Sequence, residues 1–165
     1  MKLKKITEIE TNLIEAFSCG NAELDTYFKK YASDNEKNGY GVTYVLTDEN
    51  TIFGFVTLCN AQIEFENYPK GLNNRLPRYP IPAVRIARLA VSKNYQGKGY
   101  GKTLLKYAFL KIVYVSRIVG TKLVVVDAKE SSKLFDEKYG FKRLIDTSLT
   151  YFLNIETILK AIKTK

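Results

Sequence analysis

The sequence predicts an α/β (α+β) fold in which a mixed, twisted central sheet carries helices on both faces. Strand-like and helix-like patterns alternate along the 165 residues, beginning with a strand, a helix and a hairpin. The continuous apolar run at residues 123–126 is typical of a strand buried on both sides. Hydrophobic residues make up 45% of the chain and charged residues 26%, which indicates a folded core. The length suits a single domain over residues 1–165.

The first segment, residues 2–9, alternates weakly and is interpreted as a strand. A helix is expected after Asn21, a residue type that caps the first helical turn. Asn38 and Gly39 together supply a stop signal for this helix. Its apolar stripe has the spacing i, i+3, i+4, i+7 and consists of Leu24, Tyr27, Phe28 and Tyr31.

The rest of the chain continues the alternation of strands and helices. All four prolines fall within residues 61–82, which we interpret as an ordered excursion or a loop. The other expected elements are a hairpin at 42–47 and 52–59, strands at 83–92, 123–126, 141–145 and 149–155, helices at 102–118 and 131–138, and a tail at 156–165 with helical character.

The composition excludes several classes of site. Histidine is absent, which rules out Ser-His and Cys-His nucleophilic arrangements. Cys19 and Cys59 are too few for a structural zinc site, so we expect reduced thiols and no bound metal. No apolar run approaches the roughly 20 residues that cross a bilayer, and the basic N-terminus lacks the apolar stretch of a signal peptide. The protein is therefore expected to be cytoplasmic, with no membrane partner.

The net charge of +9 favours anionic partners. Lysine and arginine total 26 against 17 acidic residues, and the positive charge is spread along the chain. Coenzyme phosphates, RNA and a membrane surface all fit this excess, and so does an ordinary lysine-rich soluble surface. The charge alone does not choose among these alternatives.

A glycine-rich segment, Gln96-Gly97-Lys98-Gly99-Tyr100-Gly101, lies between a predicted strand and a predicted helix. The first N–H groups of a helix have no partner within it, and the helix dipole adds positive potential there. Glycines let the backbone approach an anion closely, and Lys98 and Lys102 add charge. The segment thus predicts a phosphate site, although the spacing G-x-G-x-G also occurs in ordinary turns.

The surrounding sequence resembles motif A of the GNAT acetyltransferases, in which a strand ending in Leu-Ala-Val leads to Gln-x-x-Gly-x-Gly at a helix start. Val126-Asp127-Ala128 and Tyr139-Gly140-Phe141 look like the second half of the coenzyme site of that family. The resemblance implies a GNAT-like fold with acetyl-CoA as co-substrate. The coenzyme-binding residues it implies are Leu89, Ala90, Val91, Gln96, Gly97, Lys98, Gly99, Tyr100, Gly101 and Lys102.

Residues 17–25 and 82–91 look like the GNAT toxins of bacterial toxin–antitoxin pairs. That likeness implies acetylation of the free amine of aminoacyl-tRNA, and a ribbon-helix-helix antitoxin as partner. It also suggests a homodimer. Two alternatives stay open: an acetyltransferase for a small-molecule or protein amine, and a coenzyme-binding protein with weak or lost catalysis.

The implied reaction is direct attack of a neutral amine on the thioester, which requires an acid for the departing thiolate. The family often places a tyrosine four residues before the Gly-Phe pair, where this sequence has Asp136. Because aspartate is normally ionised at neutral pH, Asp136 is a poor acid unless burial raises its pKa. Tyr139, one turn further on, is the other candidate catalytic residue, with core packing and a solvent acid as alternatives.

Four basic residues are candidates for binding the acceptor: Arg85 and Arg88 on the strand before the loop, and Lys29 and Lys30 on the first helix. Side chains alternate between the two faces of a strand, so each arginine points to the opposite face from its adjacent residues. Each guanidinium therefore needs a polar partner or solvent on its own face. The arginines could contact an acceptor stem or a coenzyme phosphate. A surface salt bridge with Asp or Glu is the alternative.

Overall fold

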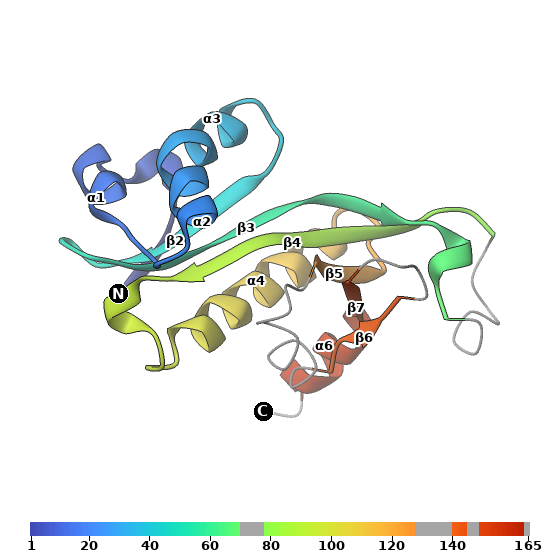
Figure 1. Ribbon diagram of the computed structural model, residues 1–165. Helices are drawn as coiled ribbons and strands as arrows, with labels where there is room; N and C mark the ends of the chain where they lie inside the picture. The colour runs from blue at the N-terminus through green and yellow to red at the C-terminus, as the bar shows by residue number, and fades with distance from the viewer. Residues whose placement is uncertain (70–77, 128–139, 145–148, 164–165) are drawn as a thin grey trace. The chain divides into compact units, whose positions relative to one another are not determined.

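The computed structural model describes residues 1–69, 78–127, 140–144 and 149–163 (Figure 1). The described strands are β1 (Lys2–Lys5), β2 (Val42–Thr47), β3 (Ile52–Ile63), β4 (Ile81–Val91), β5 (Leu123–Asp127), β6 (Lys142–Arg143) and β7 (Thr150–Asn154). The described helices include α1 (Thr11–Ala16), α2 (Ala22–Thr26), α3 (Ala32–Lys37), α4 (Tyr100–Ser116) and α6 (Ile155–Lys163). Within these ranges, no helix is both long and apolar enough to span a membrane.

The described strands form a seven-stranded sheet with the order β1-β2-β3-β4-β5-β7-β6. The pairs β1–β2, β2–β3, β5–β7 and β6–β7 are antiparallel, whereas β4 and β5 are parallel. The prediction of a mixed sheet is therefore confirmed. The chain divides into two compact units, Met1–Cys59 with Ala87–Ala108 and Asn60–Ile86 with Phe109–Lys165, and each unit has its own hydrophobic core.

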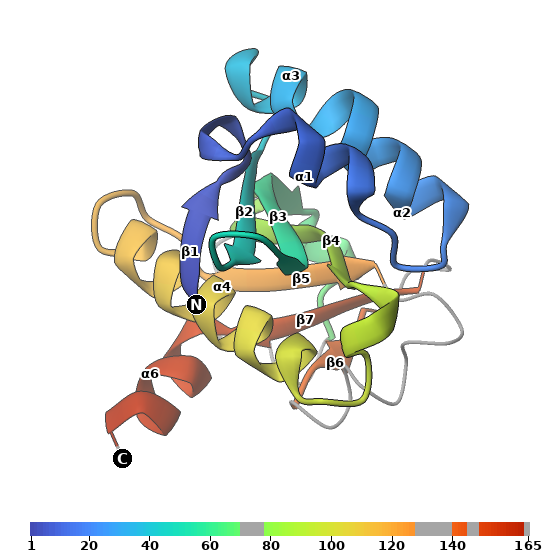
Figure 2. The ribbon, with the colours of Figure 1, turned by 90° about the vertical axis from the view of Figure 1, so that its left-hand side faces the viewer.

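In the first unit, helices cover both faces of the β2–β3 hairpin (Figure 2). On one face, α1, α2 and α3 enclose an aromatic core in which Phe28 stacks on Phe55 with ring centroids 4.5 Å apart. Phe17 packs against both rings. On the other face, the first turns of α4 lie so close to Gly54 that a Cβ built there would stand 2.8 Å from Leu104 Cδ1. Helices on both faces, as predicted, are thus present in this unit.

The helix expected between Asn21 and Gly39 is present, but a π-helical segment, Tyr27–Tyr31, separates α2 from α3. Asn21 caps the helix as predicted, since its Oδ1 accepts a hydrogen bond from the N–H of Leu24 at 3.1 Å. Gly39 ends it with a φ of +75°. The wider π-turn breaks the regular 3.6-residue spacing, and Tyr31, expected in the apolar stripe, is 55% exposed.

The region before this helix differs from the prediction. The strand predicted over residues 2–9 ends at Lys5, and a 3-10 turn at Ile6–Glu8 follows it. That turn buries Ile6 in the core of the first unit. The helix α1 was not predicted, because six residues are too few to show a helical period.

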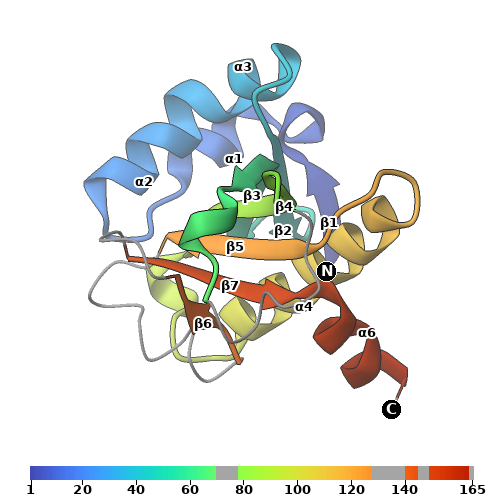
Figure 3. The same cartoon turned by 90° about the vertical axis from the view of Figure 1, so that its right-hand side faces the viewer.

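In the second unit, β5 lies between β4 and β7, and α6 continues directly from β7 (Figure 3). Leu123, Val124 and Val125 are fully buried, as the apolar run predicted. On one side of these strands, Tyr68 packs against Phe152 with ring centroids 4.8 Å apart. The predicted helical tail is confirmed by α6.

Some boundaries in this unit also differ from the predictions. The excursion expected over residues 61–82 begins later, because β3 extends to Ile63 and a 3-10 turn at Phe65–Asn67 follows. The strands expected at the end of the chain are present but shorter, as β6 and β7. The helix predicted at 131–138 lies outside the described residues.

Candidate functional site

The glycine loop connects a 3-10 turn at Lys93–Tyr95 to the first residue of α4. Gly97 and Gly99 have φ values of +73° and +87°, in the left-handed region that residues with a Cβ rarely adopt. A Cβ built at either glycine meets no described atom within 4 Å, so the backbone there borders open space. The loop therefore needs its glycines for their conformation, and it leaves room for a ligand against the chain.

The start of α4 leaves backbone donors next to this loop. The carbonyl of Gly99 accepts the first helical hydrogen bond, from the N–H of Thr103 at 3.1 Å, and the Thr103 hydroxyl reaches the same oxygen at 3.3 Å. The N–H groups of the three residues before Thr103 therefore have no acceptor within the helix. With the helix dipole and two exposed side chains, Lys98 and Lys102, these donors favour a phosphate.

Three aromatic rings, those of Phe53, Tyr95 and Tyr100, pack together next to the glycine loop. Tyr100 stacks on Phe53 of β3 with ring centroids 4.8 Å apart and an interplanar angle of 7°. Tyr95 packs edge-on against both rings, and the ammonium group of Lys98 lies 5.3 Å from the Tyr95 centroid. Tyr100, predicted to contact the coenzyme, thus also anchors the loop. Sequence reasoning missed Phe53 and Tyr95, because only the fold brings the three rings together.

Gln96, the first residue of the predicted loop, uses its side chain inside the protein. Its amide nitrogen donates to the carbonyl of Cys19 at 2.8 Å and to the carbonyl of Val91 at 3.1 Å. Both acceptors are backbone groups of the same compact unit. The side-chain amide thus joins the end of β4 to the loop before α2.

The Leu-Ala-Val segment lies at the end of β4. The described parallel pairing with β5 covers Ala83–Ile86, and β4 continues past it through Leu89 to Val91. Ala90 is buried in the core of the first unit. The strand end is tied down from β3, since the N–H of Ser92 donates to a β3 carbonyl at 2.9 Å.

Arg85 has an intramolecular partner within the second unit. Its guanidinium forms an ion pair with the carboxylate of Asp127 at the end of β5. The other oxygen of that carboxylate accepts a hydrogen bond from the hydroxyl of Thr150 at 2.9 Å. The salt bridge considered as an alternative for Arg85 is therefore present.

Arg88 lies in the first unit, where its guanidinium carbon stands 3.7 Å from the centroid of the Tyr27 ring, a cation–π contact. The Tyr27 hydroxyl is 3.4 Å from that of Thr43, which in turn is 2.9 Å from that of Thr57. These three residues are buried, so the chain of hydroxyls fixes the ring that carries Arg88. Structure rather than sequence reveals this support.

An open, mainly apolar hollow of about 420 Å³ lies beside this contact. Its lining comes from α2, the π-helical segment and β4, and consists of Ala22, Glu23, Thr26, Tyr27, Tyr31 and Arg88. Lys29 and Lys30, the two lysines considered for acceptor binding, belong to the same π-helical segment and are exposed. The lining thus includes the guanidinium of Arg88, the carboxylate of Glu23 and the exposed Tyr31, while Lys29 and Lys30 lie on the same π-helical segment outside the lining.

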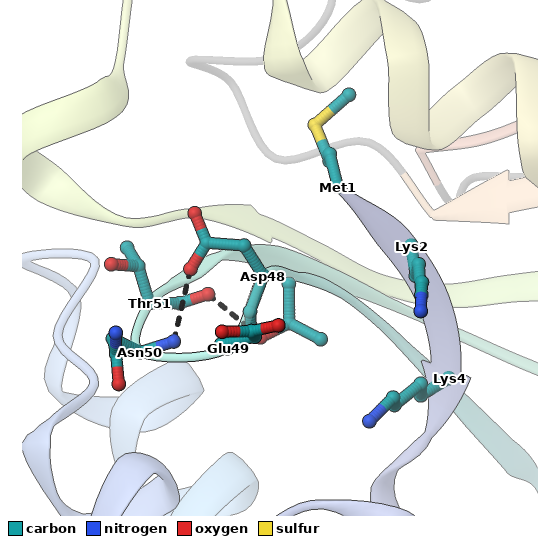
Figure 4. A pocket seen from close by; sticks show the side chains of 8 residues that line it. Met1, Lys2, Lys4, Asp48, Glu49, Asn50 and Thr51 are labelled. Atoms are coloured by element: carbon teal, nitrogen blue, oxygen red, sulfur yellow. Dashed lines mark hydrogen bonds between the residues drawn. The ribbon is translucent and has the colours of Figure 1, made fainter.

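A second hollow, of about 480 Å³, lies at the turn between β2 and β3 (Figure 4). It is lined by Met1, Lys2, Lys4, Thr47, Asp48, Glu49, Asn50 and Thr51. Asp48 accepts a hydrogen bond from the N–H of Asn50 at 3.1 Å and so holds the turn. Lysines and carboxylates face the same space, so this hollow lacks the positive bias that a phosphate site requires.

The remaining candidates for the site are the Cys19 thiol, possible metal ligands and the two candidate catalytic residues, Asp136 and Tyr139. Burial raises the pKa of Cys19 to about 11, so this thiol is protonated at neutral pH and is not a nucleophile. The described residues contain no group of His, Cys, Asp and Glu that could hold a metal ion. Asp136 and Tyr139 lie outside the described residues. Gly140, next in the chain, has a φ of +83°, and Phe141 is buried.

Comparison with known proteins assigns residues 39–143 to the family described as the acetyltransferase (GNAT) domain. The chain is 31% identical to a probable toxin TacT of Sinorhizobium fredii, with 87% of this chain and 85% of that protein covered. It is 29% identical to a tRNA-acetylating toxin of Mycobacterium tuberculosis, with 78% and 74% covered. Among solved structures, AtaT complexed with acetyl-methionyl-tRNAfMet matches with a TM-score of 0.88 and 25% identity, covering 98% of each chain.

Proposed function

Because this chain belongs to the GNAT family of acetyltransferases, we propose that it transfers the acetyl group of acetyl-CoA to the amine of an aminoacyl-tRNA, and that it acts as a toxin. The chain is an acetyl-CoA-dependent N-acetyltransferase. That the acetyl group goes to an aminoacyl-tRNA is what we propose beyond this activity. The observation that supports it most directly is similarity over most of the chain to a relative described as a tRNA-acetylating toxin.

The net charge of the chain and the exposed lysines near Arg88 agree with an RNA substrate. The net charge is +9, and phosphate neutralisation by basic side chains dominates the binding of nucleic acids. Lys29 and Lys30 are exposed on the segment that also lines the Arg88 hollow. We propose that these residues face the acceptor end of the tRNA. Arg85 is the weaker candidate, because Asp127 already pairs with it.

The coenzyme loop performs the binding step. The backbone N–H groups of residues 97–102 hold the pyrophosphate, and Lys98 and Lys102 add charge. Backbone groups at Leu89 and Val91 bond the pantetheine arm. Holding the amine and the thioester in line supplies much of the rate, since effective molarity contributes roughly 7–11 kcal/mol to such reactions.

In the transfer, the amine nitrogen attacks the thioester carbon, the carbon–sulfur bond breaks, and the nitrogen loses a proton while the thiolate gains one. We propose Tyr139 as the acid, with Asp136 and solvent as the alternatives. Turnover of Tyr139→Phe and Asp136→Ala distinguishes them, because unchanged rates in both variants leave only solvent. Asp136→Tyr is the sharper test: a large gain in rate means that the natural residue limits proton transfer.

The decisive assay for the acceptor uses radiolabelled acetyl-CoA with purified charged tRNA, with free amino acids and with a lysine peptide. We expect label on the charged tRNA alone. Label on free amines or on the peptide instead supports the small-molecule or protein acetyltransferase. Tight acetyl-CoA binding without transfer to any amine supports a coenzyme-binding protein with lost catalysis.

Two further proposals follow from a toxin role. The site of action is the cytoplasm, because charged tRNA is found there. The chain is held inactive by a ribbon-helix-helix antitoxin. A gene for such a protein beside this one, and co-purification of the two products, are the expected observations; a lone gene whose product is harmless on expression contradicts the toxin role.

A further inference from the structure

The side chain of Gln96, which begins the coenzyme loop, joins that loop to the end of β4 and to the loop before α2. Its amide nitrogen donates to the carbonyl of Val91 at the end of β4 and to the carbonyl of Cys19 in the loop before α2, at 3.1 and 2.8 Å. Gln96 itself immediately precedes Gly97 of the coenzyme loop. One side chain thus touches both the strand end and the loop at the start of α2.

A second hydrogen bond fastens the same two segments. The N–H of Lys93, in the 3-10 turn before the coenzyme loop, donates to the carbonyl of Ser18 at 2.9 Å. Residues 18 and 19 therefore both present their carbonyls to the segment that carries the coenzyme loop. Because two adjacent carbonyls are bonded, the position of residues 18–19 is coupled to that of residues 93–96.

The loop before α2 is in turn fixed to that helix. The carboxylate of Asp25 accepts hydrogen bonds from the N–H of Cys19 and from the hydroxyl of Ser18, both at 2.8 Å. Asn21 caps the helix through the N–H of Leu24. A continuous set of hydrogen bonds therefore runs from the coenzyme loop, through residues 18–19, to the first turn of α2.

The helix that receives this connection also lines the Arg88 hollow. Ala22, Glu23 and Thr26 belong to α2, and Tyr27, whose ring carries Arg88, follows directly. A shift of the first turn of α2 would therefore move the wall of the hollow. The coenzyme loop and the hollow lie in the same compact unit, so the connection is internal to it.

We propose that Gln96 is a positioning residue that fastens the 17–21 segment to the coenzyme loop, so that coenzyme binding is transmitted to α2 and the wall of the Arg88 hollow. The role of the hollow toward the acceptor rests on the proposed function. The connection itself rests only on coenzyme binding. By linkage, an acceptor that prefers the fastened α2 also binds acetyl-CoA-loaded protein more tightly.

The test compares Gln96→Leu with Gln62→Leu. Leucine removes the amide donor at similar size, and Gln96 is exposed enough for water to satisfy the two carbonyls, so the variant is expected to fold. Gln62, the other glutamine of the chain, is exposed on β3 and bonds only to Glu64 among its described contacts, at 3.2 Å. It therefore controls for the loss of a surface amide.

Amide hydrogen exchange is measured with and without saturating acetyl-CoA. In the wild type and in Gln62→Leu, we expect acetyl-CoA to slow exchange in residues 97–103 and also, by about fivefold or more, in residues 17–26. In Gln96→Leu, protection of residues 97–103 remains, but protection of residues 17–26 is clearly smaller than in the wild type, because only the bond from Lys93 to Ser18 still joins the two segments. In Asp25→Ala, protection reaches residues 17–20 and stops before α2.

Two results overturn the proposal. One is equal protection of residues 17–26 in Gln96→Leu and the wild type at saturating acetyl-CoA. The other is a wild type in which acetyl-CoA protects residues 97–103 but not residues 17–26. Neither result depends on the acceptor, so failure of tRNA acetylation and failure of this connection are separate outcomes. With charged tRNA as substrate, Gln96→Leu is further expected to raise KM for the tRNA more than KM for acetyl-CoA.

Discussion

The glycines of the coenzyme loop allow a prediction with a matched control elsewhere in the chain. Gly99 and Gly39 have similar backbone conformations, with φ values of +87° and +75°, and a Cβ built at either meets no described atom within 4 Å. Alanine at each position therefore introduces the same kind of strain and no steric clash. The two sites differ in their proposed roles, since Gly99 precedes α4 in the loop proposed to bind the coenzyme, whereas Gly39 lies just after the end of α3.

The expected stability cost is the same for Gly99→Ala and Gly39→Ala. An L-residue in the left-handed region costs about 1–2 kcal/mol, partly offset because alanine also stiffens the unfolded chain. A net loss of about 1 kcal/mol corresponds to a drop in Tm of about 2–4 °C for a chain of this size. Thermal unfolding of the ligand-free variants measures it.

The expected effect on acetyl-CoA binding is different for the two variants. At Gly99 the new methyl group occupies the open space where the pyrophosphate is proposed to lie, so Kd should rise at least about tenfold, or about 1.4 kcal/mol. At Gly39 the Kd should not change. Isothermal titration calorimetry at a temperature where both variants are folded gives both values. Wild-type affinity in Gly99→Ala, or an equal loss in Gly39→Ala, refutes the assignment of the loop.

Three further perturbations test the same unit. Gly54→Ala places a Cβ 2.4 Å from the carbonyl oxygen of Ala90, a backbone atom, so urea unfolding should show a loss of about 1–3 kcal/mol, with weaker acetyl-CoA binding because the strand end is displaced. Partial burial raises the pKa of Asp25, but hydrogen bonds from the preceding loop outweigh it and lower that pKa. Its stabilising contribution is therefore full above the unfolded-state pKa and is lost as the pH falls below about 4, whereas Asp25→Asn should lack this part of the acid-unfolding profile. Charge reversal at Lys29 and Lys30 should weaken tRNA binding and reduce its salt slope by about 2, and an unchanged slope rules both lysines out as phosphate contacts.

Most of the fold could be predicted because its signals are local. The apolar run at 123–126 predicted the buried strand β5, and Asn21 predicted the helix start that its side chain caps. The short helix α1 and the π-helical segment were not predictable, because six residues show no period and a π-turn has no distinct pattern. Tyr31 was misplaced in the apolar stripe for this reason.

The candidate site also has one part that the sequence predicts and another that only the tertiary structure shows. The sequence by itself predicted the glycine loop for which we propose coenzyme binding, because left-handed glycines before a helix are a local backbone requirement. Only the tertiary structure decided what the polar and aromatic side chains around it do. Gln96 turns to the carbonyl of Cys19, 77 positions away, and Phe53 lies beneath Tyr100, because contacts between distant segments depend on how the strands pair and pack. No local sequence pattern encodes those partners. The glycine loop could therefore be predicted from the sequence, whereas its connection to α2 could not.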